Sequence, residues 1–196
     1  MEHKTIISVD TLQENLDNPN VAILDCRFYL QEPDRAYQEY LEAHVPGAIY
    51  IHLDRDLSGK IIPGSTGRHP LPSSQMFTDR LSNWGIDAST QVIAYDNLGS
   101  ALAARVWWML RWLGHPQVSV LDGGWQAWTE GGFAVESGEN TRERKTFQAQ
   151  EHEEFIVDAQ LVEEIREDEN YLLLDARSPN RYWGLEEHTD PVAGHI

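Results

Sequence analysis

The loop Tyr95-Asp96-Asn97-Leu98-Gly99-Ser100-Ala101 is the segment whose residues could best support chemistry. It follows a short apolar run and precedes a segment of helical length, so we expect a strand that turns directly into a helix. The N–H groups of such a loop and the positive end of the helix dipole converge on one point and form an anion site. A cysteine thiolate or persulfide would be stabilised there. The loop instead begins with Asp96, whose carboxylate accepts hydrogen bonds but cannot act as a sulfur nucleophile.

Cys26 is the single cysteine of the 196 residues. It follows the apolar run Val21-Ala22-Ile23-Leu24 at a predicted strand end, where a cysteine is usually a small packed side chain. We therefore expect Cys26 to be buried and not to be a nucleophile. One cysteine cannot form an intramolecular disulfide, which suits a reducing compartment.

The charge of the chain excludes two classes of partner. A net charge of −17 and an isoelectric point near 4.7 oppose binding to nucleic acid or to an anionic membrane. No apolar run approaches the length of a membrane span, and Met1-Glu2-His3-Lys4 does not open a signal peptide. We expect a cytoplasmic protein. The histidines show no metal-ligand spacing, so no metal site is predicted.

Short apolar runs alternate with helical segments along the first two thirds of the chain. The predicted strands, rich in Val and Ile, are Val21–Asp25, Val92–Tyr95 and Val118–Leu121. The predicted helices are Pro33–Ala43, Ser73–Trp84 and Gly99–Leu113, with Ser73 as an N-cap. This order predicts an α/β fold, an open parallel sheet with helices on both faces. Ligands of such folds bind at the carboxyl ends of the strands.

Three motifs return later in the chain in the same order. Asp10 and Asp158, Asp25 and Asp175, and His44 and His195 are 148, 150 and 151 residues apart. Nearly constant spacing indicates a duplicated domain. We expect a first, degenerate copy over residues 1–136, a polar linker over 137–154, and the start of a truncated second copy over 155–196. That second copy should open with a helix over Asp158–Glu169 and a strand over Tyr171–Leu174. Arg27 and Arg177 follow the repeated aspartate and are expected to tie loops to the sheet.

Five segments carry a resemblance to a known family. They are Leu24–Leu30, His44–Ala48, Arg68–Pro72, Arg105–His115 and Val118–Trp125. Together they resemble the first domain of the tandem rhodanese family, the thiosulfate and 3-mercaptopyruvate sulfurtransferases. The resemblance implies two similar α/β domains, of which the second carries the catalytic cysteine and the first shows an aspartate such as Asp96 at the loop start. It implies no metal or organic cofactor.

The resemblance also assigns roles to three residues. Arg181 matches the position that contacts the substrate anion, which suits an always-charged planar donor; the alternative is an ion pair with Glu186 or Glu187. Asp54 and His69 match residues of the first domain that face the active site and assist proton transfer. For His69, packing of its loop is an equal alternative. No residue of this chain is expected to be the nucleophile.

The function implied for the complete protein is sulfur transfer. A cysteine outside this sequence would take sulfane sulfur from a small anionic donor, thiosulfate or 3-mercaptopyruvate, and pass it to a thiophilic acceptor, cyanide or a thiol. The 196-residue chain itself is expected to be inactive. The alternative is a non-catalytic rhodanese-like binding or regulatory module. A rhodanese-fold phosphatase would need a cysteine in the loop, which Asp96 excludes for this copy.

Overall fold

The computed structural model describes residues 5–190 and 192–195. These residues form two compact units, one ending at Glu153 and the other beginning at Glu154. Within the described residues, no helix is long and apolar enough to cross a membrane.

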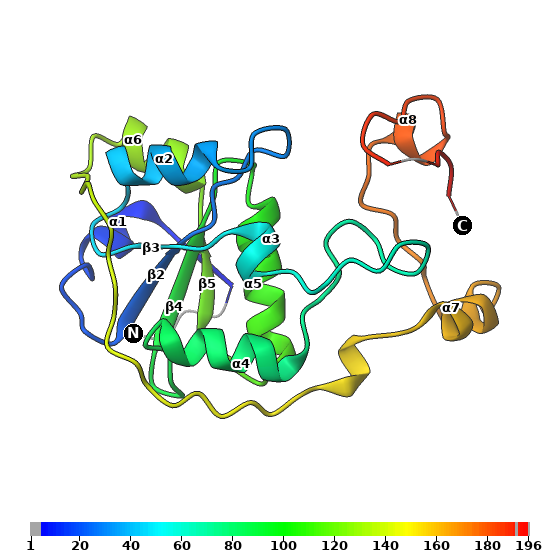
Figure 1. The fold of residues 1–196 in the computed structure, drawn as a ribbon, viewed down its shortest axis with the longest axis horizontal. Coiled ribbons are helices and arrows are strands. Elements are labelled where there is room, and N and C mark those ends of the chain that lie inside the picture. Colours follow the sequence, from blue (N-terminus) through cyan, green and yellow to red (C-terminus); the bar gives the residue numbers. More distant parts are fainter. Residues whose placement is uncertain (1–4, 191, 196) are drawn as a thin grey trace. The chain divides into compact units, whose positions relative to one another are not determined.

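A five-stranded parallel sheet forms the centre of the first unit (Figure 1). The strands are β1 (Ile6–Ile7), β2 (Val21–Asp25), β3 (Ile49–Tyr50), β4 (Gln91–Tyr95) and β5 (Val118–Leu121), in the spatial order β1-β5-β4-β2-β3. The central strands β2 and β4 pair along their whole length, and the pairing ends with Asp25 beside Tyr95. The residues that follow β2 and β4 therefore emerge together at the carboxyl edge of the sheet.

Helices cover both faces of this sheet. They are α1 (Val9–Gln13), α2 (Arg35–Glu42), α3 (Leu53–Asp56), α4 (Ser74–Asn83), α5 (Ala101–Trp112) and α6 (Gly124–Glu130). Ala22 and Leu24 of β2 pack with residues of α4 and α5, whereas Val21 and Ile23 pack with residues of α1 and α6. Alternate residues of one strand thus enter two separate apolar cores, and the predicted α/β sheet with helices on both faces is confirmed.

The predicted elements of the first unit match the observed ones within one or two residues. Val21–Asp25 and Val118–Leu121 have the predicted bounds, and the Ser73 hydroxyl accepts from the Met76 N–H at the start of α4. The edge strands β1 and β3 were not predicted, because two residues are too short to show an alternating pattern. The short helices α1, α3 and α6 were missed for the same reason of length.

The segment after α6 is extended and packs against the first unit. Arg142 donates to the carbonyls of Val21 and Pro19, and the Gln150 N–H donates to the Leu113 carbonyl. Phe147 is buried in the core between α4 and α5. Residues 137–154 were predicted from their polar composition to be a linker; of these, residues 137–152 form a strap on the first unit.

The second unit contains the short 3₁₀ helix Glu153–Phe155 at its boundary, α7 (Ala159–Ile165) and α8 (Pro179–Tyr182). Asp158 caps α7 through a bond from the Leu161 N–H, so the predicted helix exists but ends four residues early. The predicted strand Tyr171–Leu174 is wrong: this segment is irregular, and its four side chains are 53–82% exposed. A strand needs a neighbouring strand with which its backbone can form hydrogen bonds. The described residues of this unit form no strand.

Candidate functional site

The loop between β4 and α5 is closed around the side chain of Asp96, which is buried. One carboxylate oxygen accepts from the N–H groups of Leu98 at 2.8 Å and Ser100 at 2.9 Å. The other accepts from Leu102 at 2.7 Å and Ala103 at 2.9 Å. The predicted convergence of N–H groups at the start of α5 is therefore present, and the anion it binds is the loop's own aspartate.

The backbone of this loop and of the adjoining helix start adopts left-handed conformations. Gly99 and Ser100 both have left-handed conformations, with φ of 65° and 74°, which reverses the chain between strand and helix. Gly124 at the start of α6 has φ of 54°, and a Cβ there would lie 2.4 Å from the Asp96 carbonyl oxygen. The Trp125 N–H donates to that same carbonyl. The loop is thus fixed by its own side chain and by the adjoining helix.

Asp54 and His69, which lie in different segments of the chain, are in hydrogen-bond contact. Asp54 lies on α3 and His69 in the loop before α4, and His69 Nε2 is 3.0 Å from Asp54 Oδ1. Burial lowers the pKa of His69 below its usual value; Asp54 acts in the opposite direction, and Arg68 and Arg105 lower it further. A neutral imidazole beside a carboxylate can accept a proton near neutral pH.

Arg181, in α8 of the second unit, is held by two carboxylates. Its Nε and Nη2 donate to Glu187, with the shortest bond at 2.9 Å, and Nη2 also donates to Asp190 at 2.8 Å. N–H groups of Asp190 and Thr189 and the Arg181 guanidinium together lower the pKa of Glu187 to about 2. The ion pair with Glu187 that the sequence left open as an alternative is therefore formed.

Cys26 is 1% exposed, and its thiol lies 3.7 Å from the Leu24 carbonyl oxygen. Burial, with the nearby charges of Asp25, Asp96 and Asp56, raises the pKa of this thiol well above its usual value. A thiol in these surroundings stays protonated and unreactive. The prediction that Cys26 is buried is confirmed.

A buried ion pair closes the carboxyl end of β2. The Arg27 guanidinium binds both oxygens of Asp25 and donates to the Ala43 carbonyl at 2.8 Å, so Arg27 ties a loop to the sheet as predicted. The Tyr95 hydroxyl donates to Asp25 at 2.6 Å, and the Trp125 ring covers the Arg27 guanidinium at 4.2 Å. No pattern in the sequence indicates Tyr95 and Trp125 as partners of this pair.

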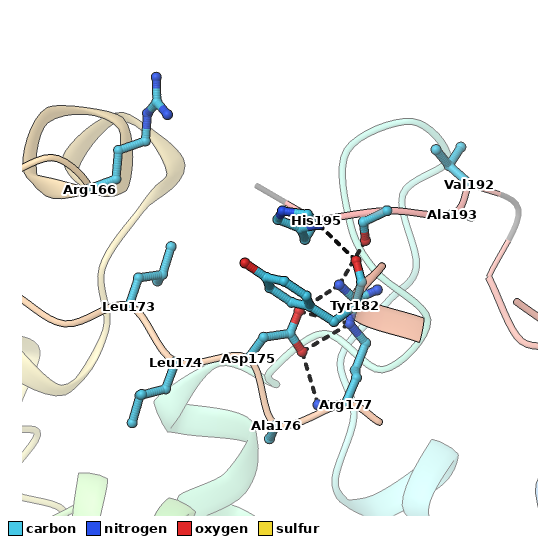
Figure 2. A pocket seen from close by; sticks show the side chains of 11 residues that line it. Arg166, Leu173, Leu174, Asp175, Ala176, Arg177, Tyr182, Val192, Ala193 and His195 are labelled. Carbon is cyan, nitrogen blue, oxygen red and sulfur yellow. Dashed lines mark hydrogen bonds and ion pairs between the residues drawn. The ribbon is translucent and has the colours of Figure 1, made fainter. Parts of the chain in front are cut away.

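The second unit contains the same arrangement (Figure 2). Arg177 binds both oxygens of Asp175 and donates to the Gly194 carbonyl at 2.8 Å. His195 stacks on Tyr182 at 3.9 Å between ring centroids, as His44 stacks on Tyr40 at 4.1 Å in the first unit. The pair Asp175–Arg177 lines an open cavity of about 700 Å³, and about a quarter of each of its side chains is exposed.

No group of three or more metal-binding side chains is found in residues 5–190 and 192–195. Asp25, Asp54 and Asp96 instead pair with Arg27, with His69 and with backbone N–H groups, respectively.

Comparisons with known proteins agree with this geometry. The sequence profile of the rhodanese-like domain matches residues 8–131. The chain is 40% identical over its whole length to a probable 3-mercaptopyruvate sulfurtransferase of Pseudomonas aeruginosa, covering 69% of that protein. It is 34% identical, over 99% of its length, to the thiosulfate sulfurtransferase of Bos taurus, covering 67% of that protein.

The fold matches as well. SseA from Escherichia coli, a solved structure with the rhodanese fold, superposes with a TM-score of 0.85 at 29% identity, over 99% of this chain and 72% of that one. The chain spans 62% to 69% of the length of the first curated relatives it matches. Because the profile covers more than half of the chain and the identity reaches 40%, the chain belongs to the rhodanese family, and the relatives that it matches along its length are thiosulfate and 3-mercaptopyruvate sulfurtransferases.

Proposed function

We propose that this chain is the first domain and the opening of the second domain of a sulfurtransferase that moves sulfane sulfur from thiosulfate or 3-mercaptopyruvate to cyanide or a thiol. The observation that carries the proposal is the loop at Asp96. It has the architecture of an anion-binding loop, and a carboxylate fills the position that a nucleophilic sulfur would need. The nucleophile is then a cysteine outside these 196 residues, because Cys26 is buried with a raised pKa.

The proposed chemistry is a covalent relay through a persulfide. The thiolate attacks the outer sulfur of thiosulfate, or the thiol sulfur of 3-mercaptopyruvate, and forms a persulfide. The S–S bond of thiosulfate breaks and sulfite leaves, or the C–S bond of 3-mercaptopyruvate breaks and pyruvate leaves as its enolate. Attack of cyanide on the persulfide gives thiocyanate and regenerates the thiolate. No cofactor enters this scheme, and we place the protein in the cytoplasm.

We assign three residues to this reaction. Asp54 and His69 form a proton-accepting pair on the first domain, supported by their 3.0 Å contact and the lowered pKa of His69. Arg181 would hold the donor anion. Its bonds to Glu187 and Asp190 use Nε and Nη2, so Nη1 is the donor we propose for the substrate.

We further propose that the two units arose by duplication, with limits at 1–136, 137–154 and 155–196. The support is the recurrence of one local geometry: an aspartate and an arginine two residues apart, bound to each other and to a carbonyl 16 or 17 residues further on. Chance similarity does not explain why the repeated motifs make the same bonds.

The test is a steady-state assay of cyanide-dependent thiocyanate formation from thiosulfate and from 3-mercaptopyruvate. The 196-residue chain should show no turnover with either donor, and a protein extended by the further third of its relatives' length should be active. Turnover by the short chain that vanishes in Cys26→Ser would contradict the proposal. Inactivity of both proteins would favour the second candidate, a non-catalytic binding module. A loop whose N–H groups are occupied by its own Asp96 is also consistent with such a module.

A further inference from the structure

Arg105 of α5 reaches two separate segments with one side chain. Its Nε and Nη2 donate to the Leu57 carbonyl at 3.3 and 2.9 Å, and Nη2 also donates to the carbonyls of His69 at 3.0 Å and Pro70 at 3.4 Å. Leu57 is the residue that ends α3, the helix that carries Asp54. One guanidinium therefore joins the end of the Asp54 helix to the loop that carries His69.

The charge of Arg105 has no carboxylate partner within the described part of the chain. Its bonds go to neutral carbonyls, and burial lowers its pKa. Burying a cation without a counter-charge is costly, so the bonds to the carbonyls must offset that cost. A planar fork can reach several carbonyls at fixed angles, which the single ammonium of a lysine cannot do.

A second contact joins the same two segments. The Gly59 N–H donates to the Pro70 carbonyl at 2.9 Å, and a Cβ on Gly59 would lie 2.7 Å from the Leu71 carbonyl oxygen. Between these segments the chain makes an excursion with exposed Ile61 and Ile62. The positions of Asp54 and His69 are therefore set by contacts at the base of this excursion.

We infer that Arg105 is a positioning residue: by binding the carbonyls of Leu57 and His69 it holds the side chains of Asp54 and His69 in hydrogen-bond contact. This inference deepens the proposed function, in which the pair accepts a proton. The hydrogen bonds of Arg105 go to backbone carbonyls and not to the side chains of the pair, so it positions them through the backbone. The charged groups that influence His69 are Asp54, Arg68 and Arg105 itself.

A double-mutant cycle read by NMR titration of the His69 imidazole tests the inference on the chain as it exists. The His69 signals are assigned with His69→Gln. Asp54→Asn should lower the pKa of His69, since Asp54 raises it by charge and by a hydrogen bond. Arg105→Lys keeps the charge but loses the planar guanidinium, so the change in the His69 pKa caused by Asp54→Asn should shrink by about half or more. In Arg105→Gln this change should disappear.

The control is Arg111→Gln, an arginine of the same helix that stacks on Trp107 and makes no contact with the His69 loop. It should leave the Asp54→Asn shift unchanged. The same shift in the parent, Arg105→Lys and Arg105→Gln backgrounds would overturn the inference; if Arg105→Gln does not fold, the lysine series alone decides. Because the readout is a titration and needs no turnover, it can fail while the sulfurtransferase assay succeeds, and the reverse.

Discussion

At the scale of single residues, Asp96 explains both the shape of the loop and its chemistry. The strand, loop and helix follow one another in sequence, so the convergence of N–H groups could be predicted without coordinates. What the sequence did not show is that all four bonds go to the aspartate itself. The role of Arg105 could not be predicted from the sequence, because its hydrogen bonds reach carbonyls 48 and 36 positions away and depend on the rotamer of one side chain.

Asp96→Asn should destabilise the first domain by about 2–4 kcal/mol, because the amide NH₂ would face backbone donors and two charge-assisted bonds would be lost. Urea unfolding followed by circular dichroism measures the change. The control is Asp122→Asn, an exposed aspartate at the carboxyl end of β5, which should change stability by less than about 0.5 kcal/mol. Equal midpoints for the two variants would show that the loop bonds contribute little.

Arg181→Ala in the longer protein should raise the donor KM and lower kcat/KM by roughly tenfold to a hundredfold, because a charge-assisted bond to the donor anion would be lost. Arg181→Lys should restore only part of the activity. Arg166→Ala is the matched control, since Arg166 pairs with Glu163 on the exposed side of α7. Unchanged donor kinetics in folded Arg181→Ala would leave this residue with the purely structural ion pair to Glu187 and Asp190.

At the scale of elements, the predictions succeeded where a segment is long and is buried by its own neighbours. The interior strands β2 and β5 and the helices α4 and α5 carry their pattern within themselves. Tyr171–Leu174 has the composition of a strand, but strand structure also needs a partner, which composition does not provide. The strap could not be predicted, because individual hydrogen bonds and one buried ring hold it on the first unit. Its sequence has no periodic hydrophobic pattern.

Phe147→Ala should destabilise the first domain by about 2–4 kcal/mol, because it empties a place in the core between α4 and α5. Thermal or urea unfolding of the variant measures the loss. Phe155→Ala, which removes a ring that is 40% exposed, should have a much smaller effect. If both variants have the same unfolding midpoint as the parent chain, residues 137–152 are a loose linker and not a strap.

At the scale of the whole molecule, the chain carries a net charge of −17, while the pKa values of three histidines in the first unit are lowered. Burial lowers the pKa of His52, His69 and His115 below the usual value. The unfolded chain therefore binds more protons than the folded chain as the pH falls through the usual histidine pKa of about 6.5. Protonation then favours unfolding.

The urea midpoint of the chain should accordingly decrease as the pH is lowered from about 7 to about 5, a range above the pKa of most carboxyl groups. Urea titrations at half-unit steps measure this slope. His115→Gln, which removes one of the three imidazoles with a lowered pKa, should make the slope shallower. A constant or rising midpoint on acidification would show that these histidines do not titrate with lowered pKa.

The central claim is that sulfur is carried by a cysteine outside these 196 residues while the loop at Asp96 carries none. Mass spectrometry of peptides from the longer protein, after incubation with thiosulfate and without an acceptor, tests it most directly. The account predicts the added mass of one sulfur atom on a single cysteine other than Cys26, and its loss when cyanide is added. Added sulfur on Cys26, or on no cysteine at all, would contradict the account.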